Sequence, residues 1–345
     1  MVLPYLLNGA GSGSGRGTTH PLPAPVATPS VRVAPLADAG ELPPLDPHQP
    51  PWPGQEITSG GVTMFVRRTP TDTGATPAVY VHGLSGSANN WTDLAAQLAP
   101  HAPGLALDLP GFGHSRPLSS GLYSPSAQAD AVLSFLGGLD RPVHLLGNSL
   151  GGTVSLLVAD RRPDLVRSLT LLAPAMPDRR PDPRRVSDPR LLLALVPWLR
   201  ARVGRRMAEV TPREGVEQMI RLCFGNPSLV AEHRILEALE EHSHRSRQPW
   251  AREALLRAAQ GMFRSWFVGP RLWSVAARLS VPALVVWGGR DRLMSPRLAV
   301  RTTLALPRGR LLALPEVGHV PQIETPVTVA RAVLGMWRAV DAGQW

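Results

Sequence analysis

A serine stands between glycines where two apolar segments meet, in "VHLLGNSLGG" (residues 143–152). The apolar run at 142–147 has the length and composition of a buried strand, and residues 152–161 follow a helical pattern. A strand that reverses into a helix within so few residues crowds the serine backbone, and small neighbours relieve that crowding. Gly147-Asn148-Ser149-Leu150-Gly151 therefore predicts a tight turn that leaves the Ser149 side chain exposed above the strand ends.

Strand and helix candidates alternate on both sides of this turn. Residues 55–69 predict two strands around Gly60-Gly61, which is typical of a β-hairpin. Further strands are predicted at 78–83, 104–111, 142–147, 166–174, 282–289 and 309–315, and helices at 90–100, 124–139, 152–161, 295–306 and 325–340. Repeated strand–helix units predict an α/β fold, a mostly parallel, doubly wound sheet with helices on both faces.

The alternation is interrupted between residues 175 and 269, where Arg-rich helical stretches are separated by prolines and no convincing strand occurs. We therefore expect a core built from residues 52–174 and 270–345, with an all-helical insertion at 175–269. Residues 1–51 are rich in Gly, Ser, Pro and Ala and show little periodicity, so they are predicted to form a disordered tail.

The composition of the chain limits which binding partners and which cellular compartment we expect for it. The 345-residue chain has a formal charge of +10 and 36 basic residues, all of them arginine. Acidic and apolar residues separate these arginines, so no nucleic-acid-binding stripe is predicted. The single cysteine, Cys223, excludes an intramolecular disulfide and fits a reducing compartment, and with no transmembrane segment predicted we expect a cytoplasmic protein. Residues 191–206 are apolar and then Arg-rich, which leaves peripheral contact with an anionic membrane as an alternative.

Ser149 has candidate partners further along the chain. A serine hydroxyl is a poor nucleophile at neutral pH and needs a base, which is itself oriented by an acid. On a strand–turn–helix elbow the chain order is serine, acid, histidine. Asp291 follows the predicted strand at 282–289, and His319 follows the one at 309–315. Both lie just past the carboxyl ends of strands, where an open α/β sheet builds its site.

Together these segments resemble the α/β-hydrolase superfamily over residues 52 to 341. The resemblance is carried by "HGLSGSANNW" (82–91, oxyanion loop), "DLPGFGHS" (108–115, the turn after the fourth strand), "GNSLGG" (nucleophile elbow), and "GGRDRL" and "VGHVPQIE" (acid and base loops). It implies the α/β-hydrolase fold with a helical cap at 175–269. It also implies that Ser149 is the nucleophile, His319 the general base and Asp291 the orienting acid.

The resemblance also suggests groups around the nucleophile. The backbone N–H groups of Leu84 and Leu150 would form the oxyanion hole. Candidates for the substrate pocket are Ser85, Asn148, Trp198, Phe263 and Trp266. For each of these residues a loop hydrogen bond or simple packing within the cap is the competing interpretation. His82, Asp108 and His114 are expected to brace the loops around the site.

The predicted activity is hydrolysis of a carboxylic ester, or a related acyl bond, of a small apolar substrate through an acyl-enzyme at Ser149. Relatives that attack with aspartate, such as epoxide hydrolases, are disfavoured because position 149 is serine and no tyrosine lies in the insertion. A C–C bond hydrolase of ring-fission products and a non-catalytic ligand-binding scaffold remain as alternatives. The absence of a Rossmann fingerprint, a Walker loop and zinc-ligand spacing predicts no cofactor and no metal.

Overall fold

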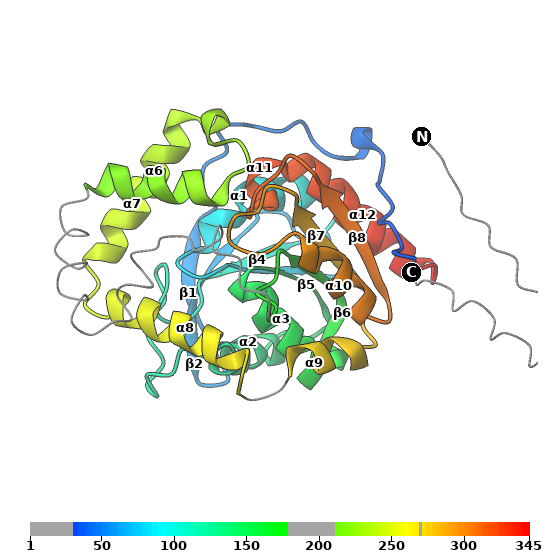
Figure 1. Cartoon of the computed structure of the whole chain (residues 1–345), viewed down its shortest axis with the longest axis horizontal. Helices are drawn as coiled ribbons and strands as arrows, with labels where there is room; N and C mark the ends of the chain where they lie inside the picture. The colour runs from blue at the N-terminus through cyan, green and yellow to red at the C-terminus, as the bar shows by residue number, and fades with distance from the viewer. Residues whose placement is uncertain (1–29, 179–210, 269–270) are drawn as a thin grey trace, which may run out of the picture. The chain divides into compact units, whose positions relative to one another are not determined.

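A single eight-stranded sheet lies at the centre of the computed structural model, which describes residues 30–178, 211–268 and 271–345 (Figure 1). Its order is β1-β2-β4-β3-β5-β6-β7-β8. The strands β1 and β2 form the predicted antiparallel hairpin, β2 pairs antiparallel with β4, and every later neighbour pair is parallel. The bounds are β1 Gly54–Ser59, β2 Val62–Arg68, β3 Ala78–Val81, β4 Gly104–Leu107, β5 Val143–Asn148, β6 Val166–Leu172, β7 Ala283–Gly288 and β8 Gly309–Leu314.

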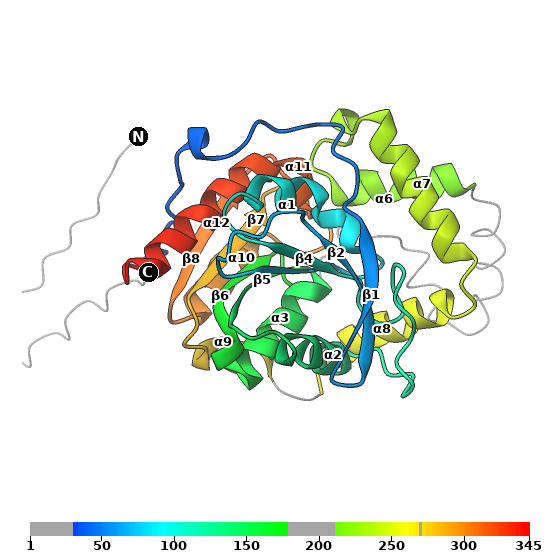
Figure 2. The same cartoon turned by 180° about the vertical axis from the view of Figure 1, so that it is seen from behind.

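Helices cover both faces of the sheet, as the alternating sequence pattern predicts (Figures 1 and 2). One face carries α2 (Pro125–Gly137), α3 (Leu150–Arg161), α9 (Leu272–Arg278) and α10 (Arg297–Ala305). The other carries α1 (Thr92–Leu98), α11 (Pro321–Glu324) and α12 (Pro326–Asp341). Short 3₁₀ turns occur at Ala39–Glu41, Ala88–Trp91, Pro163–Leu165 and Pro227–Leu229.

The two faces have separate apolar cores, which explains why the central strands carry apolar side chains on both faces. In β5, Leu145 packs into the cluster that includes α3, and the next residue, Leu146, packs into the cluster that includes α12. Successive side chains of a strand point to opposite faces, so a sheet covered on both sides buries every one of them. This burial holds the carboxyl ends of β5, β7 and β8 in a fixed relation.

The described part of the predicted insertion is helical. Residues 211–268 form α6 (Pro212–Cys223), α7 (Glu232–Ser246) and α8 (Ala251–Ser265), which lie together beside the sheet (Figure 1, left). Each of these helices pairs an apolar side with a charged side, unlike α3, in which residues 150–159 are all buried. Their sequence pattern is therefore that of helices covered on one side only.

The prediction of a disordered tail up to residue 51 is wrong for residues 31–51. Val31–Trp345 forms one compact unit, and Val33 makes a parallel bridge to Leu311 at the edge of β8. Ala34, Ala37 and Leu42 are buried there. Apart from the 3₁₀ turn at Ala39–Glu41, the segment forms no helix or strand of its own, and it is tied by backbone hydrogen bonds, including those joining Leu311 to Arg32 and Ala34. A proline-rich extended chain has no periodicity, so its sequence gave no sign of this packing.

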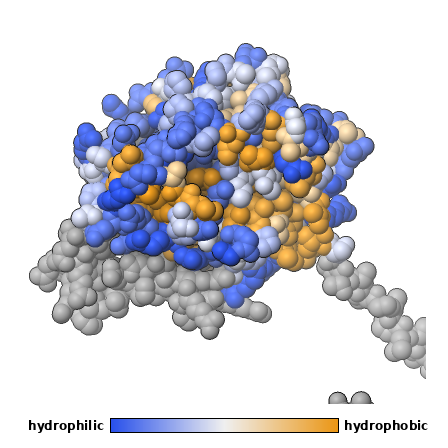
Figure 3. All heavy atoms as spheres, turned by 90° about the horizontal axis from the view of Figure 1, so that it is seen from above, coloured by the Kyte–Doolittle hydropathy of each residue, from blue (hydrophilic) through white to orange (hydrophobic). Residues whose placement is uncertain are grey.

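The face of the molecule drawn in Figure 3 is largely hydrophilic, with separate apolar patches. Several large apolar side chains of the described helices are exposed, among them Leu236, Leu256 and Phe263. Within the described ranges, none of the helices combines the length and the apolar character that crossing a membrane requires.

Two buried histidines make the stability of this fold depend on pH. Burial lowers the pKa of His82 to about 4 and that of His144 to about 3. The His144 ring stacks on Trp337 and bonds to the Ser168 hydroxyl. Below pH 6.5 the unfolded chain takes up protons that the folded chain does not, so stability falls as the pH drops from 6.5 toward these values.

We therefore expect His144→Gln to weaken this acid destabilisation. From a pKa of 6.5 in the unfolded chain, one buried neutral histidine accounts for about 2 kcal/mol of stability lost between pH 7 and pH 5. Urea unfolding at both pH values measures this difference for the wild type and the variant. Equal pH dependence in the two proteins would contradict the assignment of His144 as a buried neutral group.

Candidate active site

Ser149 lies in a strained turn between β5 and α3. Its backbone has φ 54° and ψ −116°, a left-handed conformation that residues other than glycine rarely adopt. Its N–H donates to Leu172 O in β6 (2.9 Å), and its carbonyl accepts from the N–H groups of Thr153 and Ala175. The turn predicted from the glycines therefore exists, and hydrogen bonds from three segments hold it.

The glycines of this turn have no room for a side chain. A Cβ on Gly147 would lie 2.3 Å from the carbonyl oxygen of Gly151. A Cβ on Gly151 would lie 2.2 Å from the carbonyl oxygen of Val81 in β3. The elbow can therefore pack against β3 only when both positions are glycine.

Asp291 and His319 are joined as the sequence predicts. The Asp291 Oδ2 and His319 Nδ1 atoms are 2.8 Å apart, and both side chains are buried. The other oxygen, Oδ1, accepts from the backbone N–H groups of Leu293 and Met294. The carboxylate is thus fixed at both oxygens. With Nδ1 donating to it, the imidazole keeps Nε2 free to accept a proton.

The backbone of His319 is tied to the elbow through Asn148. The Asn148 Nδ2 donates to His319 O and to Leu172 O, each at 3.1 Å. Asn148 therefore positions the base loop and is held there by structural bonds. Among the described residues, no hydrogen bond joins Ser149 Oγ to the His319 ring. Such bonds are often long in uncomplexed sites and shorten when substrate binds.

The loop at residues 82–91 packs directly against the serine. A Cβ on Gly83 would lie 3.2 Å from Ser149 Cβ. His82 lies beneath this loop, where its Nδ1 contacts Gly83 O (2.7 Å) and its Nε2 accepts from Leu109 N–H (3.0 Å). Leu150 is the first residue of α3, a position whose N–H has no acceptor one turn earlier in the helix. Leu84 thus follows a residue that packs against Ser149, and Leu150 directly follows Ser149.

Asp108 braces the loops as expected. Its two carboxylate oxygens accept from the N–H groups of Ala88 (2.6 Å) and His114 (2.7 Å), and its carbonyl accepts from the Ser115 hydroxyl. Burial raises the pKa of Asp108 to about 7, against the effect of these backbone donors. The side chain therefore joins the loop at 82–91 to the turn after β4.

Glu324 is a residue of the site to which sequence reasoning assigned no role. Its two oxygens accept from Gly318 N–H (2.7 Å) in the base loop and from Gly225 N–H (2.8 Å) just after α6. The same two segments also meet where His319 N–H donates to Cys223 O (2.6 Å). Glu324 thus fastens the loop of His319 to the end of α6. The "VGHVPQIE" segment contains this glutamate, but only the fold brings residue 225 to it.

The predicted pocket residues are only partly brought together. Trp266 is half-buried, and its indole N–H donates to the carbonyl oxygen of Ala175 (3.1 Å). The backbone N–H of Ala175 in turn donates to the carbonyl oxygen of Ser149. Phe263 packs edge-on against Trp266 but is 52% exposed, so it does not line an enclosed cavity. Ser85 bonds to Arg245 of α7. Trp198 and residues 191–206 lie outside the described residues.

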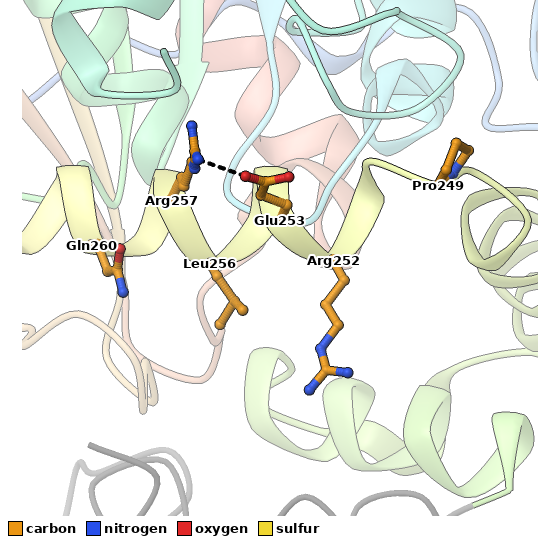
Figure 4. Close-up of a pocket in the computed structure, with 6 residues that line it drawn as sticks. All are labelled: Pro249, Arg252, Glu253, Leu256, Arg257 and Gln260. Carbon is orange, nitrogen blue, oxygen red and sulfur yellow. Dashed lines mark ion pairs between the residues drawn. The ribbon is translucent and has the colours of Figure 1, made fainter. Parts of the chain in front are cut away.

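A hollow of about 380 Å³ runs along the outer side of α8 (Figure 4). Its lining residues include none of the predicted site residues, and Glu253 and Arg257 within it form an ion pair. Among the described residues, no group of three His, Cys, Asp or Glu side chains is placed to hold a metal ion. We therefore assign no ligand to the hollow and place the candidate site at Ser149.

Comparison with known proteins agrees with this geometry. Residues 76–326 match the family model described as the alpha/beta hydrolase fold. The chain belongs to the alpha/beta-hydrolase family. This confirms the resemblance of its loops, and the fold places each of them at the carboxyl ends of the parallel strands.

The relatives of this chain include proteins named for different activities. The chain is 32% identical over 268 residues to the dihydrolipoyllysine-residue acetyltransferase component of an acetoin cleaving system from Pseudomonas putida, covering 77% of this chain and 64% of that relative. It is 29% identical over 256 residues to a pimeloyl-[acyl-carrier protein] methyl ester esterase of Neisseria meningitidis, covering 72% of this chain and 88% of the esterase.

A solved structure shows the same fold at lower identity. The 2-hydroxy-6-oxo-6-phenylhexa-2,4-dienoate hydrolase from Rhodococcus sp. strain RHA1 has a TM-score of 0.65 and 21% identity, covering 83% of this chain and all of that one. Family membership, with an esterase among the relatives, supports a hydrolase.

Replacing Glu324 with alanine should loosen the junction of α6 and the base loop. Two partly buried N–H groups would lose a charged acceptor, so we expect a loss of about 2 kcal/mol in the free energy of unfolding. Hydrogen exchange of residues 316–320 should also become faster. Glu316→Ala is the matched control, because within the described part of the chain that exposed carboxylate pairs with Arg290 alone, and exposed pairs contribute little. Equal stability of the two variants would contradict the role given to Glu324.

Proposed function

We propose that the chain is a serine hydrolase that cleaves a carboxylic ester, or a related acyl bond, of a small apolar substrate. The observation that carries the proposal is the left-handed Ser149 at the elbow, next to a buried Asp291–His319 pair. A non-catalytic scaffold has no need of a strained serine beside an oriented histidine. Backbone strain of this kind costs about 1–3 kcal/mol, and it is characteristic of active sites.

In the proposed reaction, Ser149 Oγ attacks the carbonyl carbon of the ester while His319 Nε2 takes the hydroxyl proton. The N–H groups of Leu84 and Leu150 donate to the oxyanion of the tetrahedral intermediate. His319 then returns the proton to the leaving alcohol, which departs and leaves an acyl group on Ser149. Water, deprotonated by His319, attacks the acyl-enzyme. His319 then returns this proton to Ser149 Oγ as the bond to the serine breaks and the carboxylic acid is released.

The helices of the insertion are proposed to form the cap over this site. Trp266 reaches the elbow through Ala175, and the end of α6 is bonded to the loop of His319. These contacts link Trp266 to the backbone of the elbow, and the Cys223–Gly225 segment to the loop of His319. An apolar acyl group is therefore the proposed substrate part on this side.

The same machinery could cleave a C–C bond, because a ring-fission product also presents a carbonyl carbon to the serine. The structural likeness to the Rhodococcus hydrolase shows the shared fold alone. The match with the Neisseria esterase spans 88% of the length of that esterase. This supports an ester substrate over a C–C bond. Comparing p-nitrophenyl esters with a vinylogous 1,5-diketone substrate separates the two.

We expect the wild type to hydrolyse p-nitrophenyl esters, and Asp291→Asn to lower kcat by about 10³–10⁴ with little change in melting temperature. The asparagine carbonyl can still accept from Leu293 and Met294, so its amide would face His319 Nδ1. Nδ1 would then accept and Nε2 would carry the proton, which removes the base. An Asp291→Asn variant that kept most of the wild-type kcat would contradict this role of the Asp291–His319 pair.

The matched control is Asp130→Asn. Asp130 is exposed on α2, where it pairs with Arg161. Its variant should leave kcat unchanged.

A further inference from the structure

Arg245, near the end of α7, reaches from the proposed cap to the oxyanion loop. Its Nη1 donates to both oxygens of Ser85, to the carbonyl at 2.7 Å and to the hydroxyl at 2.8 Å. Burial lowers the pKa of Arg245, with Glu241 acting in the opposite direction. A guanidinium taken this far out of water needs such partners, and most of those it has belong to Ser85.

Ser85 requires outside support. Within the described residues only Ser85, Ser149 and Ala173 have positive φ without being glycine, and the φ of Ser85 is 66°. For an L-residue this conformation costs about 1–2 kcal/mol. The two bonds from Arg245 are accepted by the backbone carbonyl and the hydroxyl of this one residue, so they hold the strained conformation directly.

The conformation of Ser85 matters because it follows Leu84, whose N–H is a proposed oxyanion donor. The loop's own bonds, such as Gly86 N–H to Gly83 O and Ala88 N–H to Asp108, fix the peptides on either side of Ser85. The direction of the peptide planes between these anchors depends on the φ of Ser85. An oxyanion donor must point at the developing charge, and a small misplacement removes much of its effect.

The helix that carries Arg245 is itself docked by charged and polar contacts on one side. Arg234 pairs with Asp93 of α1 (2.6 Å), and Glu241 accepts from the Asn89 amide (3.1 Å). Residues 234, 241 and 245 are spaced by seven and four positions, so they share one face of α7. The position of α7 is therefore set by the core before Arg245 reaches Ser85.

From this geometry we propose that Arg245 is a positioning residue, which holds Ser85 in its left-handed conformation and so aims the oxyanion-hole N–H of Leu84. The proposal rests on the proposed function. Its consequence is that the oxyanion hole is complete only when α7 is seated on the core, because the supporting side chain comes from the helical insertion.

The test compares Arg245→Met with Arg247→Met in the full chain, using p-nitrophenyl ester hydrolysis. Arg247, just after α7, is the matched control because it is exposed and, among the described residues, its side chain bonds to Ser243 alone. We expect Arg245→Met to lower kcat about 10–100-fold with KM within about threefold of wild type, since a misaimed donor is a loss in the transition state. A residue that contacted the substrate directly would raise KM and leave kcat unchanged, and that result would overturn the proposal.

A second substitution separates positioning from general damage. Glycine adopts positive φ at no steric cost, so Ser85→Gly should hold the loop without the arginine. In the Arg245→Met background, adding Ser85→Gly is expected to raise kcat at least tenfold. A loss of kcat that Ser85→Gly leaves unchanged would contradict the role of the left-handed conformation.

A measurement that needs no turnover keeps this proposal separate from the proposed function. Hydrogen exchange of residues 83–90 should become faster in Arg245→Met and stay at the wild-type rate in Arg247→Met. Unchanged exchange in Arg245→Met would overturn the positioning role, whatever the activity. If the wild type had no esterase activity but exchange were faster in Arg245→Met, the proposed ester hydrolysis would be refuted. The claim that α7 supports the loop at residues 83–90 would still stand.

Discussion

The left-handed backbone of Ser149 is the constraint on which the rest of the site depends. It allows β5 to become α3 within one residue, so the serine side chain stands above the sheet at the carboxyl ends of the strands. The strain is maintained by close packing, because Gly151 lies against β3 and the Ser149 N–H is bonded to β6. Central parallel strands that are buried on both faces cannot shift without opening two apolar cores. The stability of the whole sheet thus supports one unfavourable residue.

Glu324 and Arg245 make two of the contacts that connect the helical insertion with the loops around this serine. Glu324 bonds the loop of His319 to the residues after α6, and Arg245 of α7 bonds the loop that precedes the 3₁₀ turn at Ala88–Trp91. Both contacts involve a charged side chain with backbone groups, and charge-assisted bonds of this kind are stronger than neutral ones. The insertion therefore supports the loops of the proposed site.

The fold and the principal residues could be predicted because their signals are local. The apolar runs, the glycines around Ser149 and the placement of Asp291 and His319 after predicted strands each depend on a few neighbouring residues. Residues 31–51 were mispredicted because an extended chain rich in proline bonds through its backbone, which leaves no pattern in side chains. The short α11 was not predicted because four residues are too few to show a helical period.

The contacts that support the site could not be predicted in the same way. Arg245 and Ser85 are 160 positions apart. The chain has 36 arginines, and nothing in the sequence indicates which of them contacts Ser85. Gly225 and Glu324 are 99 positions apart and meet only because α6 ends beside the base loop. Such pairs follow from the packing of whole elements, so they become visible only when the fold is known.

The central claim is that Ser149 is an activated nucleophile, and covalent labelling tests it most directly. Intact mass would be measured after incubation with a fluorophosphonate, for the wild type, for Ser149→Ala and for Ser120→Ala, which changes an exposed loop serine. The account predicts a single adduct on the wild type and on Ser120→Ala, mapped by peptide mass to Ser149 and absent from Ser149→Ala. A folded wild type that forms no adduct, or an adduct that persists in Ser149→Ala, would contradict it.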